Sequence, residues 1–134
     1  EVDLLQSIPG VGPVYAALIA VEIGDIGRFR DSNHLASYAG VAPRKEESGT
    51  SVHKRRKRKG GNRRLKNALM QSSQRSVQCD PLARAYYERK RAERKKHLQA
   101  LRALARHRVT VIFAMLNEGT FYEPPVEVDE NGRG

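Results

Sequence analysis

The chain has 134 residues and a formal net charge of +10 at pH 7, from 25 Lys or Arg and 15 Asp or Glu. Its hydrophobic content of 39% is enough for one modest core but not for two domains. A single cysteine excludes an internal disulfide framework and a multi-cysteine zinc site, and no apolar run is long enough to cross a bilayer. Because it begins at Glu1 without a signal-peptide pattern, we expect a piece of a longer, cytoplasmic protein that binds nucleic acid rather than membrane.

The N-terminal part, residues 2–24, predicts two helices joined by a glycine hairpin. Residues 2–7 suit one or two helical turns, and the Pro-Gly-Val-Gly-Pro stretch at 9–13 is a turn signal whose second proline can open a helix. This is the pattern of a helix-hairpin-helix element. The backbone of Gly10 and Gly12 and the positive end of the following helix could hold a DNA phosphate. The alternative is a packing hairpin that touches no nucleic acid.

The stretch 31–40 predicts a third helix, capped by Asp31 or Ser32 and ended by Gly40. Residues 41–61 then carry no sustained period and predict a basic loop, which could include a short β-hairpin across Gly49. Eleven Lys or Arg and two Glu lie between residues 44 and 66. This concentration favours a segment that binds phosphates over an evenly charged solvated surface.

A serine hydroxyl lies among these cations. The oxygen of Ser48, beside Gly49, could attack phosphorus while Lys and Arg stabilise the charge that grows on the phosphate oxygens. Spacing alone favours the simpler interpretation, a loop serine that merely neighbours phosphate-binding cations. The nucleic-acid-binding candidates of this region are Arg44, Lys45, Lys54, Arg55, Arg56, Arg58, Asn62, Arg63, Arg64 and Lys66.

Three more helices are predicted within a helical region at 62–119. Asn62 caps the first, an Asp-Pro pair at 80–81 restarts the second, and a break near residues 95–97 precedes a long third helix that Gly119 ends. The residues expected to point inward from the second helix are Leu82, Ala85 and Tyr86. The apolar face expected of the third helix comprises Leu98, Leu101, Leu104, Ala105, Val109, Ile112, Met115 and Leu116. Residues 120–134 predict a disordered acidic tail.

The sequence gives only weak signals for metal binding, for a second basic binding face and for tyrosine chemistry. The four histidines pair with no Cys or carboxylate at metal-ligand spacing, and the carboxylates avoid the basic centre, so we expect no metal site in this chain. A second basic block, at 84–108, fits the exposed surface of a helix as well as it fits a binding face. Tyr86 and Tyr87 could stack on bases or supply a nucleophile, but packing between helices is the simpler interpretation.

The order of the motifs is more specific than any one of them. The sequence runs through Ile8-Pro9-Gly10-Val11-Gly12, Phe29, Leu35-Ala36-Ser37-Tyr38-Ala39-Gly40-Val41-Ala42-Pro43, Ser48-Gly49 and Gly61-Asn62-Arg63-Arg64-Leu65-Lys66. Over residues 4–118 this order resembles the C-terminal transposase domain of the insertion-sequence family often called IS one-ten, the DEDD transposases. Lys66 stands where the pattern more often has Arg. The lysine keeps the positive charge but lacks the planar guanidinium that can bind a phosphate through two hydrogen bonds.

This resemblance implies a site-specific DNA recombinase of a mobile element. An N-terminal RuvC-like domain, absent from this chain, would carry four acidic ligands for Mg²⁺, so this chain alone would need no cofactor and would be inactive. The serine of the family's Ser-Gly pattern maps to Ser48, which would hold DNA as a phosphoserine. The implied partners are DNA, a noncoding bridge RNA that guides the enzyme, and further copies of the full-length protein.

We therefore expect a mostly α-helical domain that supplies the serine for DNA strand cleavage and exchange. Two alternatives remain open: a non-catalytic helix-hairpin-helix module that binds DNA or structured RNA, and a domain used mainly for oligomer assembly through its last helix. If Ser48 is not the nucleophile, the next candidates are Ser37 and Ser51.

Overall fold

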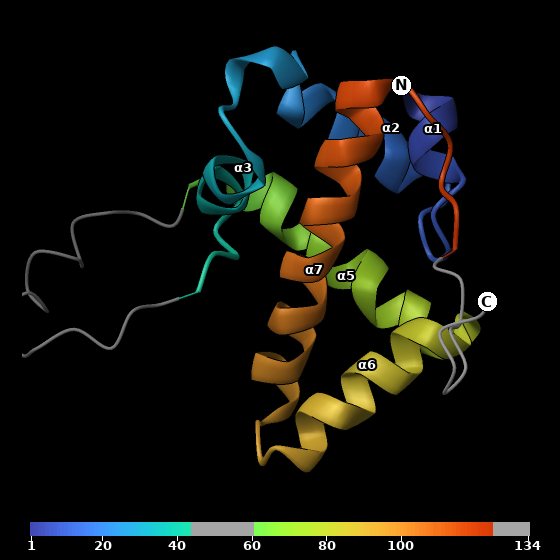
Figure 1. Ribbon diagram of the computed structural model, residues 1–134, viewed down its shortest axis with the longest axis vertical. Helices are drawn as coiled ribbons and strands as arrows, with labels where there is room; N and C mark the ends of the chain where they lie inside the picture. The colour runs from blue at the N-terminus through green and yellow to red at the C-terminus, as the bar shows by residue number, and fades with distance from the viewer. Residues whose placement is uncertain (44–60, 125–134) are drawn as a thin grey trace, which may run out of the picture.

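The computed structural model describes residues 1–43 and 61–124, and this part of the chain is helical without a strand (Figure 1). The predicted mostly α-helical class is confirmed. None of the described helices is long and apolar enough to cross a membrane. The elements are α1 (Val2–Gln6), α2 (Pro13–Ile23), the 3₁₀ turn η1 (Ile26–Arg28), α3 (Ser32–Ala39), α5 (Arg63–Cys79), α6 (Pro81–Ala92) and α7 (His97–Glu118).

The ends of the helices follow local signals in the sequence. The side chain of Asp31 accepts a hydrogen bond from the N–H of His34 at 2.8 Å, and Asp80 accepts one from Leu82 at 3.2 Å. Gly40 and Gly119 end α3 and α7 in the left-handed conformation that glycine adopts without a steric penalty. The predicted caps and stops of these helices are therefore confirmed.

The long helix α7 is the centre of the fold (Figure 1). Its buried face, from Ala100 to Leu116, packs against α3, α5 and α6. Leu98 was predicted on this face, but 65% of it is exposed; in the first turn of α7 the residue that contacts α6 is His97, through Tyr87. The expected inward role of Ala85 is also wrong: Ala85 is exposed, and Ala83 is the buried residue of α6.

The hairpin between α1 and α2 rests against a face of small residues on α5. Ser72, Ser73 and Ser76 are buried there, which lets the backbone of the hairpin approach closely. Gly10 has φ +90°, and a Cβ at this position would lie 2.7 Å from the carbonyl oxygen of Ser72. Close packing against α5, together with the positive φ, therefore requires the glycine at position 10.

The C-terminal end of the described chain returns to the hairpin. The N–H of Tyr122 donates to the hydroxyl of Ser7 at 2.8 Å, and the Tyr122 side chain packs against the core. The prediction of a disordered tail from residue 120 is therefore wrong for its first residues, because an aromatic anchor holds them. Residues 125–134 lie outside the described part.

Candidate nucleic-acid interface

The C-terminal end of α3 and the N-terminal end of α5 meet where the basic segment leaves and rejoins the described chain (Figure 1). On the leaving side Val41 is fully buried, and its carbonyl oxygen accepts a hydrogen bond from Nη1 of Arg106 at 3.4 Å. On the returning side the N–H of Asn62 donates to the carbonyl oxygen of Tyr38 at 2.6 Å. The described residues on both sides of the basic segment are therefore attached to the core.

Several predicted site residues belong to this segment, residues 44–60, which lies outside the described part of the chain. The roles given to them stay predictions, as does the short β-hairpin at Gly49. They are Ser48, Arg44, Lys45, Lys54, Arg55, Arg56 and Arg58.

Asn62 organises the returning end. Its Oδ1 accepts the N–H of Leu65 at 2.9 Å and so caps α5, as predicted. Its Nδ2 donates to Oε1 of Glu22 at 2.7 Å and to the hydroxyl of Tyr38 at 3.2 Å. One side chain therefore joins α2, α3 and α5, and it fixes the direction in which α5 begins.

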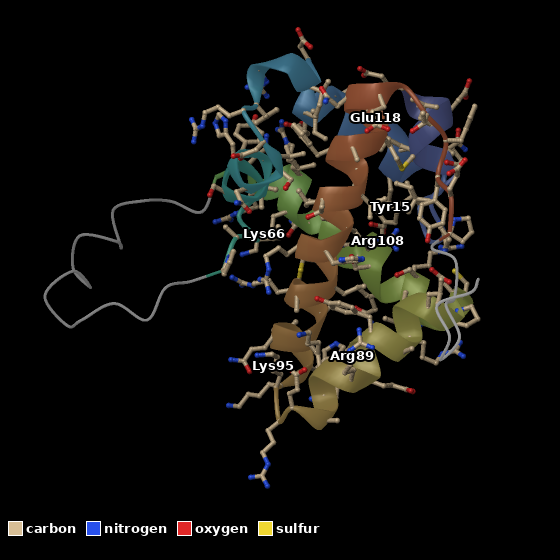
Figure 2. The ribbon with its side chains drawn as sticks, viewed as in Figure 1. Tyr15, Lys66, Arg89, Lys95, Arg108 and Glu118 are labelled. Atoms are coloured by element: carbon tan, nitrogen blue, oxygen red, sulfur yellow. The ribbon has the colours of Figure 1, made fainter. Side chains whose placement is uncertain are left out.

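Within residues 1–43 and 61–124, Glu22 is the carboxylate that pairs with a cation at this end of α5. Oε2 of Glu22 lies 3.7 Å from Nη1 of Arg64, whose side chain is 79% exposed. The first turn of α5 holds no acidic residue, so the positive end of the helix dipole adds to the exposed charges of Arg63 and Arg64. Figure 2 shows Lys66 on the same end of α5, beside α3. This helix end presents a positive surface that suits a phosphate.

Arg28 extends the positive surface toward η1. Its guanidinium carbon lies 4.8 Å from the ring centroid of Tyr38 and 4.6 Å from that of Phe29, and its Nε donates to the carbonyl oxygen of Ile23 at 3.0 Å. Hydrogen bonding from Arg28, followed by that from Asn62, lowers the pKa of the Tyr38 hydroxyl from its ordinary value. The ring of Tyr38 thus lies in a positive environment.

The two glycines of the hairpin lie in different surroundings. Gly10 faces α5, whereas a Cβ at Gly12 would meet nothing within 4 Å, so the backbone at the start of α2 is accessible there. The hairpin touches α5 near Ser72, ten residues from Asn62, which is about 15 Å along a helix. The structure therefore does not bring the hairpin and the cationic end of α5 to one point, and DNA contact at Gly10 and Gly12 stays a prediction.

Sequence reasoning missed the residues that hold this interface together. Glu22, Arg28 and Arg106 come from three elements, and no spacing in the sequence connects them with Asn62. Tyr38 and Asn62 both lie in stretches that define the family resemblance, which was the one available signal that they belong together.

Changing Asn62 tests whether this network is stronger than an ordinary helix cap. Asn62→Ala removes the cap and two further hydrogen bonds, so we expect about 2–3 kcal/mol less free energy of unfolding. The matched control Asp31→Ala removes an exposed cap bond, at the start of α3, and should cost about 1 kcal/mol. Urea unfolding followed by circular dichroism measures both, and equal losses would contradict the network.

Comparison with known proteins shows the family of this chain. The sequence profile described as the Transposase IS116/IS110/IS902 family matches residues 2–88. A 43.6 kDa protein of insertion element IS110 from Streptomyces coelicolor is 51% identical over 120 residues, covering 90% of this chain and 30% of that protein. The pilin gene-inverting protein of Moraxella bovis is 34% identical over 118 residues, covering 87% and 37%. The chain thus spans about a third of the length of the curated relatives that it matches.

Proposed function

The chain belongs to the Transposase IS116/IS110/IS902 family, and from that premise we propose that it is the part of a transposase that holds DNA and supplies the serine for strand cleavage and exchange. Ser48 is the proposed nucleophile. The cations at the start of α5, together with those of residues 44–60, are proposed to hold the phosphates on either side of the cleaved bond.

One observation carries this proposal: the described residues that flank the segment containing Ser48 are both held on the core, Val41 by Arg106 of α7 and Asn62 by Tyr38, and Asn62 also caps the positive end of α5. Ser48 lies five positions after Pro43 in the sequence, and an extended chain covers at most about 3.6 Å per residue. Chain connectivity therefore keeps Ser48 within about 18 Å of Pro43. A phosphodiester bound near Arg63 and Arg64 is consistent with attack by a hydroxyl from this segment.

The proposed reaction is a reversible transesterification. The Ser48 oxygen forms a bond to phosphorus and gives up its proton, while the bond from phosphorus to one deoxyribose oxygen breaks and that oxygen takes a proton. Attack by the hydroxyl of another strand then reverses these steps and joins the new ends. Cations that contact the phosphate oxygens stabilise the extra negative charge of the transition state.

The resemblance also implies Mg²⁺, held by a RuvC-like domain. Among the described residues no group of three or more His, Cys, Asp or Glu could hold a metal ion, so these residues do not fit that role. We propose that the metal ligands lie in the rest of the full-length protein and that the 134 residues alone show no turnover. A noncoding guide RNA and further copies of the full-length protein are the partners proposed beside DNA.

Salt dependence tests the DNA contact directly. If about six phosphates are neutralised, the affinity of the chain for duplex DNA should fall about a thousandfold between 50 and 200 mM salt. Arg63→Gln should lower the slope of log affinity against log salt by about one, because it removes one phosphate contact. Arg75→Gln is the matched control, an exposed residue on the same helix with the same loss of charge. Fluorescence anisotropy measures these slopes, and a flat response, or equal effects of the two changes, would contradict the assignment.

A further inference from the structure

A second candidate site lies at the opposite end of α5, far from residues 44–60. A cavity of about 400 Å³ opens between α6, α7 and the hairpin, and Asp80, at the C-terminal end of α5, is part of its lining. The 17 residues of α5 separate it from Asn62 by about 25 Å. The cavity is large enough for one nucleotide.

One wall of the cavity is aromatic. The rings of Tyr86 and His107 stack with their centroids 5.2 Å apart and their planes inclined by 21°. The Tyr86 hydroxyl donates to the carbonyl oxygen of Ala103 at 3.4 Å, which holds the ring in place. Burial lowers the pKa of His107, and the positive charges of Arg108 and Arg89 lower it further, so its imidazole is neutral at pH 7. A neutral ring pair of this kind offers a surface on which a flat heterocycle can stack.

The charged groups of the cavity are of both signs. Arg108 is buried, with only 6% of its surface exposed, and its Nη2 donates to the carbonyl oxygen of Pro9 at 2.7 Å. Arg89 lies nearer the solvent, with its guanidinium carbon 5.3 Å from the Tyr86 centroid. Figure 2 shows Arg89 and Arg108 on the same side of α7, in the angle between α6 and α7. The carboxylates of Asp80 and Glu123 also line the cavity.

The combination of aromatic rings with charged groups of both signs limits which kinds of ligand the cavity can bind. A purely apolar molecule would leave the Arg108 and Asp80 side chains desolvated, and a lone phosphate would meet the carboxylates of Asp80 and Glu123. A nucleotide matches every group: its base can stack on the aromatic wall, its ring edges can bond to carboxylate and guanidinium, and its phosphate can lie near Arg89. The base must be unpaired, because a base inside a duplex cannot enter a cavity.

We propose that this cavity receives one unpaired nucleotide, with its base against the Tyr86–His107 pair and its phosphate toward Arg89. Cations at the C-terminal end of α6 and in the turn that leads to α7 would contact the nucleic-acid backbone where it leaves the cavity. These cations are Lys90, Arg91, Arg94, Lys95 and Lys96. The inference goes beyond the proposed strand exchange, because the cavity binds a nucleotide whether or not Ser48 is the nucleophile.

Nucleoside monophosphates test the proposal on the 134-residue chain. Ribo- and deoxyribonucleotides should shift the NMR resonances of the Tyr86 and His107 rings saturably, with dissociation constants of about 1 mM. Inorganic phosphate is the matched probe without a base and should leave both rings unshifted. The absence of a saturable shift, or an equal shift with phosphate, would overturn the proposal.

Paired variants locate the binding. Ala85→Phe fills the cavity from an exposed position and should weaken nucleotide binding at least about tenfold, whereas Ala92→Phe on the same helix should not. Arg89→Gln should weaken it also, and Arg75→Gln, an exposed arginine outside the cavity lining with the same change of charge, should not. Circular dichroism confirms that each variant is folded. Equal effects within either pair would overturn the assignment to this cavity.

Single-stranded oligonucleotides identify the source of the nucleotide. Ala85→Phe should weaken the binding of uridine oligomers and of thymidine oligomers of equal length. The oligomer with the lower dissociation constant shows whether RNA or DNA is the partner. A duplex that binds with the same dependence on Ala85 would contradict a site for unpaired bases. Arg63→Gln should leave nucleotide binding unchanged, so failure at this cavity and failure at the start of α5 are distinguishable.

Discussion

Ser48→Ala in the full-length protein should abolish DNA recombination while DNA binding is retained. Removing a nucleophile removes the covalent intermediate itself, so we expect recombination to fall at least about a thousandfold. The change deletes one oxygen and no charge, so the salt-dependent affinity for DNA should stay the same. A recombination assay on supercoiled plasmid, paired with fluorescence anisotropy on the same preparation, measures both quantities.

Two serines serve as matched controls for this change. Ser51 lies three residues further along the same segment, and Ser37 is exposed near the C-terminal end of α3. Ser51→Ala and Ser37→Ala should leave recombination within about twofold of the unchanged protein. Full recombination by Ser48→Ala would contradict Ser48 as the nucleophile. If none of the three changes has an effect, the non-catalytic binding module becomes the better account.

Gly61→Ala should destabilise the domain more than the same change at Gly10, Gly12, Gly24, Gly27 or Gly119. Gly61 has φ +76°, and a Cβ there would press against the carbonyl oxygens of Tyr38 and Ser37. Both obstacles are backbone atoms at the attached end of α3, which cannot move aside as a flexible side chain would. We expect a loss of about 3 kcal/mol or more in the free energy of unfolding, measured by urea titration.

Gly119 provides the control for backbone strain alone. It has φ +71°, but a Cβ at this position would meet nothing within 4 Å. Gly119→Ala should therefore cost only about 1 kcal/mol, the penalty of a left-handed alanine. If both variants lost the same free energy, the close approach of Gly61 to Tyr38 would not hold.

Much of the fold could be predicted because its signals are local. Asp31, Asn62 and Asp80 cap helices through the backbone next to them, and Gly40 and Gly119 end helices by their own conformation. These effects need no knowledge of distant parts of the chain. The helices and their order were therefore predicted close to where the structure has them.

The errors occur where tertiary packing decides. Leu98 fits the apolar period of α7 but is 65% exposed, whereas Arg108 is buried on the same helix, where a distant carbonyl at Pro9 accepts its hydrogen bond. Likewise, Glu22 and Asn62 meet only because α2 packs along α5. Contacts between residues far apart in sequence carry no periodic signal, so Glu22, Arg28 and Arg106 escaped prediction.

The central claim is that the hydroxyl of Ser48 becomes joined to DNA during strand exchange. The most direct measurement is mass spectrometry of the full-length protein after reaction with its DNA, followed by denaturation, nuclease digestion and proteolysis. We predict a peptide in which Ser48 carries a phosphodeoxynucleotide, and no such peptide from Ser48→Ala. A nucleotide found on a different residue, or active recombination without any protein–DNA adduct, would contradict the account.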